Sequence, residues 1–257
     1  MAHKNWNSID ESILEFDNVY CAFLDILGYK NKSEDFFQNK FNLYGRIERA
    51  LKSTKNIIEI STLFIDFEEI DISFFSDSII IVTPQKKNNL YNILHYSRVL
   101  SAHLSFEGLF IRGGIASGKH LQTNTSTGSE FLASEALQKA YYLECEFAIN
   151  PRILIEPSLL HNATPSEKEL ILLENNEYIV DYASIIINEN GNNEGDVYQE
   201  MEDILNYKNN SSLDNVKNKY QWILDYYYWK VLQGENFDIT RFAKFYSGKS
   251  MGFKKLP

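Results

Sequence analysis

The sequence predicts an α+β fold in which the order of elements is strand, helix, hairpin, helix, strand. The first observation is a short apolar run, VYCAFLDIL at 19–27, which ends at Gly28 as a strand buried on both faces does. The second is a pair of apolar runs on either side of Ser76 and Asp77, which indicates two strands joined by a tight turn. The third is apolar spacing of three and four residues between these strands, which indicates amphipathic helices.

The elements can be placed in order along the chain. A helix is predicted from Ser33 to Lys52, where apolar residues share one face, namely Phe37, Phe41, Tyr44, Ile47 and Leu51. The later predicted elements are a helix at 90–104, a strand at 109–121 that ends in glycines, a helix at 132–147, and strands at 151–160 and 177–188. This is the order of a ferredoxin-like βαββαβ unit with extra strands.

We expect three segments, an N-terminal stretch at 1–18, a folded domain at 19–189 and a helical C-terminal appendage at 190–257. The appendage begins Asn-rich and acidic, and then one helical face carries Val216, Tyr220, Ile223, Tyr227 and Val231. The aromatic run WILDYYYWK at 222–230 is expected to pack against the folded domain or a second subunit. The basic end, SGKSMGFKKLP, is expected to be a mobile tail.

Composition limits the function. The net charge is −10, from 25 Lys and Arg against 35 Asp and Glu, which disfavours DNA or RNA binding but leaves room for a local phosphate pocket. The two cysteines, Cys21 and Cys145, are too few for a disulfide framework and are expected to be buried thiols in the cytosol. No apolar segment approaches the roughly 20 residues of a membrane span, so we expect a cytoplasmic protein with no membrane partner.

Two carboxylates stand out because of where they fall. Asp25 ends the first strand and Asp77 lies at the hairpin turn, and these two places are adjacent in a ferredoxin-like sheet. Magnesium favours hard oxygen ligands and takes one or two protein carboxylates, so the pair could share a metal. The alternative is that each aspartate caps a turn.

Other features favour simpler interpretations. The stretch GGIASGKH at 113–120 nearly matches a phosphate loop, but His120 occupies the magnesium-binding position and no helix follows. Lys119 remains a candidate phosphate contact at the edge of the site. The five histidines lie in separate elements, which disfavours a zinc site. Glu144 is expected to be a helix-end carboxylate with a structural partner.

Four motifs in sequence order resemble those of class III nucleotide cyclases, the adenylate and guanylate cyclase superfamily. FLDILGY resembles F-x-D-I-x-G-F/Y, FFSDSIIIV resembles the I-G-D hairpin, and IRGGIASGK resembles the R-V-G-I-x-x-G strand. SEALQKAYYLE then resembles G-x-x-V-N-x-A-x-R-L-E, and RILIEPSLL resembles the strand that follows. The resemblance covers about residues 19–165 and implies the palm domain of a cyclase.

Carried over by position, the resemblance implies a site with two Mg²⁺ or Mn²⁺ ions. Asp25, Asp77 and the Ile26 carbonyl would hold the metals. The backbone that would cradle phosphates comprises Leu27, Gly28, Tyr29 and Lys30. Arg112 would touch the triphosphate, because a guanidinium matches phosphate oxygens, although a surface ion pair is the alternative.

The sequence departs from the family at four positions. The transition-state Asn and Arg fall on Gln138 and Tyr142, and Tyr142 cannot supply a permanent positive charge. Lys139 or Arg152 could substitute from another direction. The base-reading positions fall on Ser73 and Phe131, which meet neither purine rule and leave room for a pyrimidine nucleotide, as in the pyrimidine cyclases of bacterial antiphage signalling.

The resemblance therefore implies an enzyme that converts a nucleoside triphosphate into a 3',5'-cyclic nucleotide and pyrophosphate, acting as a homodimer whose sites are built across the interface. The alternative is a nucleotide-binding pseudo-cyclase, a sensor or scaffold, which Tyr142 favours. A related palm that joins two nucleotides ranks lower, because FSDS carries one carboxylate where such proteins carry G-G-D/E-E/D.

Overall fold

Nine strands form one sheet across the residues that the computed structural model describes, 15–61, 69–125, 127–189, 193–234, 237–249 and 251–256. The strands are β1 (Asp17–Ile26), β2 (Asp71–Phe75), β3 (Ser78–Pro84), β4 (Ile111–Asn124), β5 (Glu130–Ser134), β6 (Ile153–Ile155), β7 (Ile171–Glu174), β8 (Glu177–Val180) and β9 (Phe253–Lys255). The helices are α1 (Tyr29–Phe37), α2 (Leu43–Ser61), α3 (Asn89–Phe106), α4 (Glu135–Phe147), α5 (Pro165–Lys168), α6 (Glu194–Asn210), α7 (Asp214–Val231) and α8 (Ile239–Phe242). The sheet order is β2-β3-β1-β4-β6-β8-β7-β9, with β5 paired to β4.

The first four strands form the predicted ferredoxin-like unit. β1 lies between β3 and β4 and is antiparallel to both, so that Ala22 faces Ile81 on one side and Ile115 on the other. β2 completes the hairpin with β3. This strand order confirms the α+β, βαββαβ prediction.

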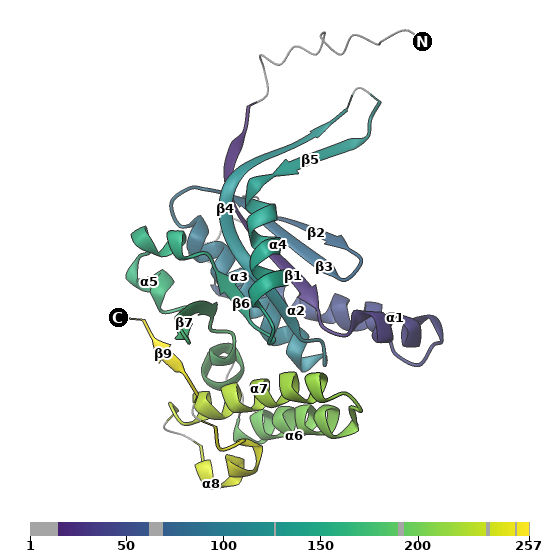
Figure 1. Cartoon of the computed structure of the whole chain (residues 1–257), viewed down its shortest axis with the longest axis vertical. Coiled ribbons are helices and arrows are strands. Elements are labelled where there is room, and N and C mark those ends of the chain that lie inside the picture. Colours follow the sequence, from purple (N-terminus) through teal and green to yellow (C-terminus); the bar gives the residue numbers. More distant parts are fainter. Residues whose placement is uncertain are drawn as a thin grey trace.

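Helices cover both faces of this unit (Figure 1). On β1, Ala22 and Leu24 point into the large core that contains α3. The alternate residues Val19 and Cys21 instead pack against Ala136 of α4. The period of two along the strand therefore divides its side chains between two helical layers.

Small residues of β4 allow α4 to lie close to the sheet. A Cβ atom added to Gly114 would lie 2.3 Å from the backbone oxygen of Ala140, and one added to Gly118 would lie 2.9 Å from the backbone nitrogen of Ala136. The glycines of GGIASGKH thus serve packing within a strand. The phosphate-loop interpretation is excluded, because this stretch lies inside β4.

Several predicted boundaries were wrong. The helix expected from Ser33 to Lys52 is two helices, because Asn39 adopts a left-handed conformation with φ 57° and the Asn42 side chain accepts a hydrogen bond from the Gly45 N–H at 3.0 Å. The strand expected at 151–160 is β6 followed by a 3-10 turn at 157–162. The strand expected at 177–188 is β8 followed by a π-helical turn at 185–189. β5 and β7 were not predicted as strands.

The C-terminal helices are joined to the sheet through one core. Ile223, Tyr226 and Tyr227 of α7 belong to the same cluster of buried residues as β1 and α3, which confirms the expected packing of the aromatic run. The tail expected to be mobile contributes β9, in which Phe253 pairs with Glu174 of β7. The paired helices α6 and α7 lie beside the end of the sheet at which β1 finishes (Figure 1).

Candidate functional site

The two predicted metal ligands lie on neighbouring backbone segments. Asp25 is the penultimate residue of β1, and Asp77 follows Ser76 in the β2–β3 turn. The turn is held to the strand by the N–H of Ile26, which donates to the carbonyl of Asp77 at 2.9 Å. Ser76 allows the tight turn by adopting a left-handed φ of 58°. The fold therefore places both carboxylates at one end of the sheet.

Arg112 joins Asp25 to a third carboxylate. It pairs with Asp25 across β1 and β4, and its Nε lies 3.1 Å from Asp25 Oδ2. Its second nitrogen, Nη2, lies 2.7 Å from Oε1 of Glu144 on α4. The Nη1 atom donates to the carbonyl of Ala148 at 3.4 Å. The guanidinium thus has protein partners on three sides, and one of its two ion pairs is with a buried carboxylate, so this is not the surface ion pair considered as the alternative.

Glu144 is the structural carboxylate that the sequence indicated, with Arg112 as its partner. Only 2% of its side chain is exposed. Burial raises the pKa of Glu144 above its usual range, and the negative charges of Asp25 and Asp77 raise it further, against the opposing effect of Arg112. The Cys145 thiol donates to Glu144 Oε2 at 3.1 Å. The negative charges of Asp25, Asp77 and Glu144 therefore repel one another, and the positive charge of Arg112 offsets part of this repulsion.

The backbone after β1 turns sharply into α1. Gly28 has φ 70° and precedes the helix, a conformation that glycine adopts without strain. The N–H of Leu27 donates to the carbonyl of Phe110 at 2.8 Å, so the predicted phosphate cradle loses this donor. Tyr29 and Lys30 occupy the first turn of α1, where N–H groups have no acceptor within the helix.

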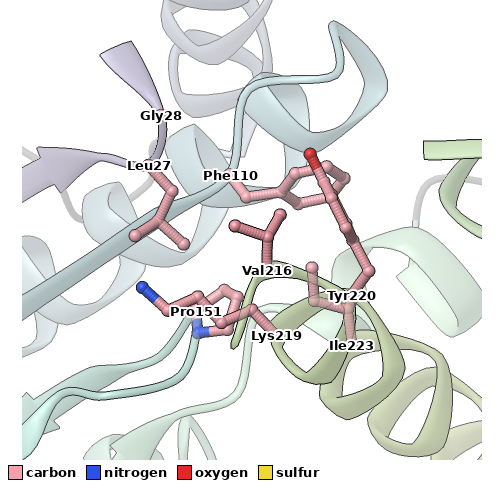
Figure 2. A pocket seen from close by; sticks show the side chains of 8 residues that line it. All are labelled: Leu27, Gly28, Phe110, Pro151, Val216, Lys219, Tyr220 and Ile223. Atoms are coloured by element: carbon pink, nitrogen blue, oxygen red, sulfur yellow. The ribbon is translucent and has the colours of Figure 1, made fainter. Parts of the chain in front are cut away.

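A small pocket of about 80 Å³ opens beside this turn. Its wall combines Leu27, Gly28 and Phe110 from the sheet end with Val216, Lys219, Tyr220 and Ile223 from α7, and Pro151 (Figure 2). The Lys219 side chain extends along Pro151 toward Leu27 (Figure 2). Burial lowers the pKa of Lys219, and the positive charge of Arg112 lowers it further, against the opposing effects of Asp25 and Glu144. Sequence reasoning missed Lys219, because its proximity to Gly28 arises only from long-range packing.

The two departures that fall at the transition-state positions lie on the outer side of α4. Gln138 and Tyr142 are both exposed, Tyr142 at 57%. The Tyr142 ring packs edge-on against Phe147 with centroids 5.6 Å apart. In the described part of this one chain neither residue forms a hydrogen bond, ion pair or ring contact with Asp25 or Asp77, so any role at the site requires a second copy.

The two predicted base-reading residues do not face one pocket. Ser73 lies in a second hollow of about 510 Å³ between the β2–β3 and β4–β5 hairpins. Glu130 and Leu132 line the same hollow from β5. Phe131 lies between these two in the strand, and alternate residues of a strand point to opposite faces. Ser73 therefore remains a candidate for recognising a base, whereas Phe131 faces away from that hollow and is 48% exposed.

Three other cations were candidates from the sequence, and each either lies far from Asp25 or forms ion pairs with other carboxylates. Lys119 pairs with Asn18 of β1, about 24 Å along the strand from Asp25. The Lys139 ammonium lies 2.9 Å from Glu135 and donates to the Ser117 carbonyl at 3.1 Å. Arg152 is buried and forms ion pairs with two carboxylates, at 2.7 Å with Glu174 and 2.5 Å with Glu177. None of the three therefore replaces the missing arginine in this chain.

The donor set at Asp25 and Asp77 suits a hard divalent cation. It consists of carboxylate and carbonyl oxygens, and the Arg112 contact uses only Oδ2 of Asp25. No group of three or more His, Cys, Asp or Glu residues with metal-binding geometry occurs among the described residues, so the protein's share of ligands would be small. Such sparse protein ligation is usual for magnesium that also binds substrate phosphates.

Two further predictions concern the cysteines and the membrane. Cys21 is buried as expected, and burial raises the pKa of its thiol to about 12. Cys145 is exposed, which corrects the expectation that both thiols are buried. None of the helices within the described ranges has the length and apolar character needed to cross a membrane.

No protein-family model and no curated protein matches the sequence. Among solved structures, the guanylate cyclase domain of RhGC from Catenaria anguillulae, in complex with GTP, is similar over 65% of this chain and 98% of its own, with 11% identity and a TM-score of 0.46. The catalytic core of a rhodopsin-guanylyl cyclase with converted specificity, in complex with ATPαS, is similar over 56% of this chain and 79% of its own, with 13% identity and a TM-score of 0.38.

Proposed function

We propose that the protein is a nucleotide cyclase, which converts a nucleoside triphosphate into a 3',5'-cyclic nucleotide and pyrophosphate. The observation that carries the proposal is the backbone hydrogen bond from Ile26 to Asp77, 2.9 Å long, which brings the Asp25 strand end and the Asp77 turn together. Two aspartates brought together at this place in a βαββαβ sheet favour phosphoryl transfer by two metal ions. They favour it over the alternative that each aspartate only caps its own turn.

Asp25, Asp77 and the Ile26 carbonyl would hold two Mg²⁺ or Mn²⁺ ions. When bound, such ions activate an attacking hydroxyl and screen the charge of a triphosphate. The chain's own groups prepare this site. Arg112 fixes the side chain of Asp25 through the 3.1 Å contact, and Gly28 brings the first turn of α1 close to where phosphates would lie.

The reaction forms one bond and breaks another on the same phosphorus. The ribose 3'-hydroxyl oxygen bonds to the α-phosphorus, and the bond from that phosphorus to the oxygen bridging to the β-phosphate breaks. Pyrophosphate leaves with the electron pair, and the hydroxyl proton passes to solvent. Gln138 is suited to donate an amide hydrogen bond to the phosphoryl oxygens from a second copy of the chain.

A homodimer is part of this proposal. The outer side of α4 exposes large apolar residues near Gln138, and these are Tyr141, Tyr142, Phe147 and, just beyond the helix, Ile149. Exposed apolar clusters of this kind favour a protein interface. Sedimentation velocity at micromolar concentration tests it, and a monomer at all concentrations up to those of the activity assay would refute the shared site.

The decisive experiment incubates the purified protein and Mn²⁺ with each of the four ribonucleoside triphosphates and identifies products by mass spectrometry. We expect one cyclic nucleotide, and a pyrimidine is the first candidate because Ser73 and Phe131 meet neither purine rule. Asp25→Asn and Asp77→Asn should each abolish the product, whereas Asp203→Asn on α6 should not. The proposal would be refuted if none of the four triphosphates gave a cyclic product. It would also be refuted if the two site variants gave as much product as the wild type.

A second candidate function is favoured by Tyr142. A phenol in place of the expected guanidinium removes a fixed positive charge from the reacting phosphate. A pseudo-cyclase of this kind would be a sensor or scaffold that binds triphosphate and metal without turnover. Thermal stabilisation by triphosphate with Mn²⁺, combined with the absence of a cyclic product after prolonged incubation, would establish this alternative in place of the first.

A further inference from the structure

The C-terminal helix α7 places one cation beside the sheet end that carries the candidate site. Lys219 shares a pocket with Leu27 and Gly28, the residues that directly follow the Asp25 strand (Figure 2). Within the described part of the chain its ammonium forms no hydrogen bond or ion pair. Arg112, by contrast, is engaged by Asp25, Glu144 and the Ala148 carbonyl.

The position of α7 is fixed by several buried contacts, so Lys219 is held at a defined place. The Tyr226 hydroxyl donates to Asp181 at 2.7 Å, and the Lys230 ammonium pairs with the same carboxylate. The Trp222 indole N–H donates to Glu174 at 2.8 Å, and the Tyr227 hydroxyl lies 2.8 Å from the Ser105 hydroxyl. A charge on such a rigid element can meet a ligand with little loss of conformational entropy.

We propose that Lys219 binds the β- or γ-phosphate of the substrate, so that α7 supplies in the same chain a cation that the cyclase motif places elsewhere. The inference rests on the proposed function in one respect, because it assumes a nucleoside triphosphate at the Asp25 end of the sheet. The inference goes beyond the proposed function because it assigns the C-terminal segment a role in binding.

The electrostatics of the pocket support this assignment. An ammonium that is half-buried and lacks a partner is unfavourable, and Arg112 adds like-charge repulsion, which is why the pKa of Lys219 is lowered. An incoming phosphate provides the missing counter-charge and would form a charge-assisted hydrogen bond. The ligand-free arrangement is therefore suited to an anion.

We expect the Lys219→Met variant to fold. Removing an unpaired, partly desolvated charge should leave the unfolding temperature equal to or above that of the wild type. Lys217, two residues earlier on α7, offers a matched control, because its ammonium already lies 3.6 Å from Asp214 near the helix start. Lys217→Met removes one charge from the same helix without entering the pocket.

The experiment measures binding with two probes, inorganic pyrophosphate and each ribonucleoside triphosphate, by calorimetry in the presence of Mn²⁺. We expect Lys219→Met to weaken both by about tenfold or more, Lys219→Arg by less than threefold, and Lys217→Met by less than twofold. Affinity for the corresponding nucleoside, which lacks phosphate, should not change in any variant.

The outcomes separate this inference from the cyclase proposal. Wild-type affinity in Lys219→Met would overturn the inference, whatever the cyclase assay shows. Equal weakening by Lys217→Met would overturn it as well, because the effect would then be one of overall charge. Failure of the wild type to bind either probe would also overturn it. Loss of binding in Lys219→Met together with no cyclic product from the wild type would support it and refute only catalysis.

Discussion

Replacing Arg112 by methionine tests whether this residue organises the site through Asp25 and Glu144. The substitution keeps much of the apolar stem of the side chain but removes every ion pair of the guanidinium. Glu144 is then left buried without its cation, at 2% exposure, beside the negative charge of Asp25. We therefore expect Arg112→Met to destabilise the fold as well as the site.

The magnitude follows from the burial of the partners. Removing one partner of a fully buried ion pair costs about 3 to 5 kcal/mol. Arg112 is 26% exposed and Asp25 is 19% exposed, so solvent screens part of the loss. We expect Arg112→Met to lower the free energy of unfolding by about 2 to 3 kcal/mol at pH 7.

The sign of the pH dependence is also determined. Without Arg112 the pKa of Glu144 rises further above 4.5, the ordinary value at which this carboxyl ionises in the unfolded chain. Between these two values the folded state keeps a proton that the unfolded state has released, so stability falls as the pH rises. The deficit of Arg112→Met should therefore be smaller near pH 5 than near pH 8.

Urea unfolding followed by circular dichroism, at pH 5, 6, 7 and 8, measures this deficit. The Arg112→Met, Glu144→Gln double variant should recover about 1 kcal/mol or more, because the neutral amide removes the uncompensated charge. A single variant within about 0.5 kcal/mol of the wild type at pH 7, or a deficit that does not change with pH, would refute the reasoning.

Two further predictions concern stability. Burial raises the pKa of Glu200 to about 8, so the free energy of unfolding of the wild type should fall as the pH rises from about 4.5 to 8, by about 3 kcal/mol between pH 4.5 and 7. Glu200→Gln should remove this loss in urea unfolding across the range, and an unchanged pH dependence would contradict the prediction. Gly114→Ala should cost about 1 to 3 kcal/mol in thermal unfolding, because the new Cβ meets the Ala140 carbonyl. An unchanged unfolding temperature would refute the packing argument.

The sequence predicted the parts of the fold that local patterns determine. The apolar run ending at Gly28 and the two runs around Asp77 carry their strand character within a few residues, and the strand order of the βαββαβ unit followed from them. The predicted ends of helices were wrong where the conformation of a single residue determines them. At Asn39, for example, a left-handed backbone conformation separates α1 from α2. β7 was missed because its four residues are too short to show a period.

The candidate site was predicted only where its residues belong to one continuous structural unit. Asp25 and Arg112 lie on adjacent strands and Asp77 lies in the turn that enters the strand on the other side of β1, so knowledge of the strand order suffices to bring them together. For Glu144 of α4 the sequence predicted a structural partner but did not identify that partner as Arg112.

The cation of α7 could not be inferred in this way. The motif resemblance ends near residue 165, and α7 begins at Asp214, so no spacing in the sequence relates Lys219 to Gly28. What relates them is the shared core, in which Ile223 and Tyr227 pack with β1 and α3. If Lys219 binds a substrate phosphate as proposed, the C-terminal segment is part of the candidate site. Removing that segment should therefore impair phosphate binding and the core together, whereas Lys219→Met should impair phosphate binding alone.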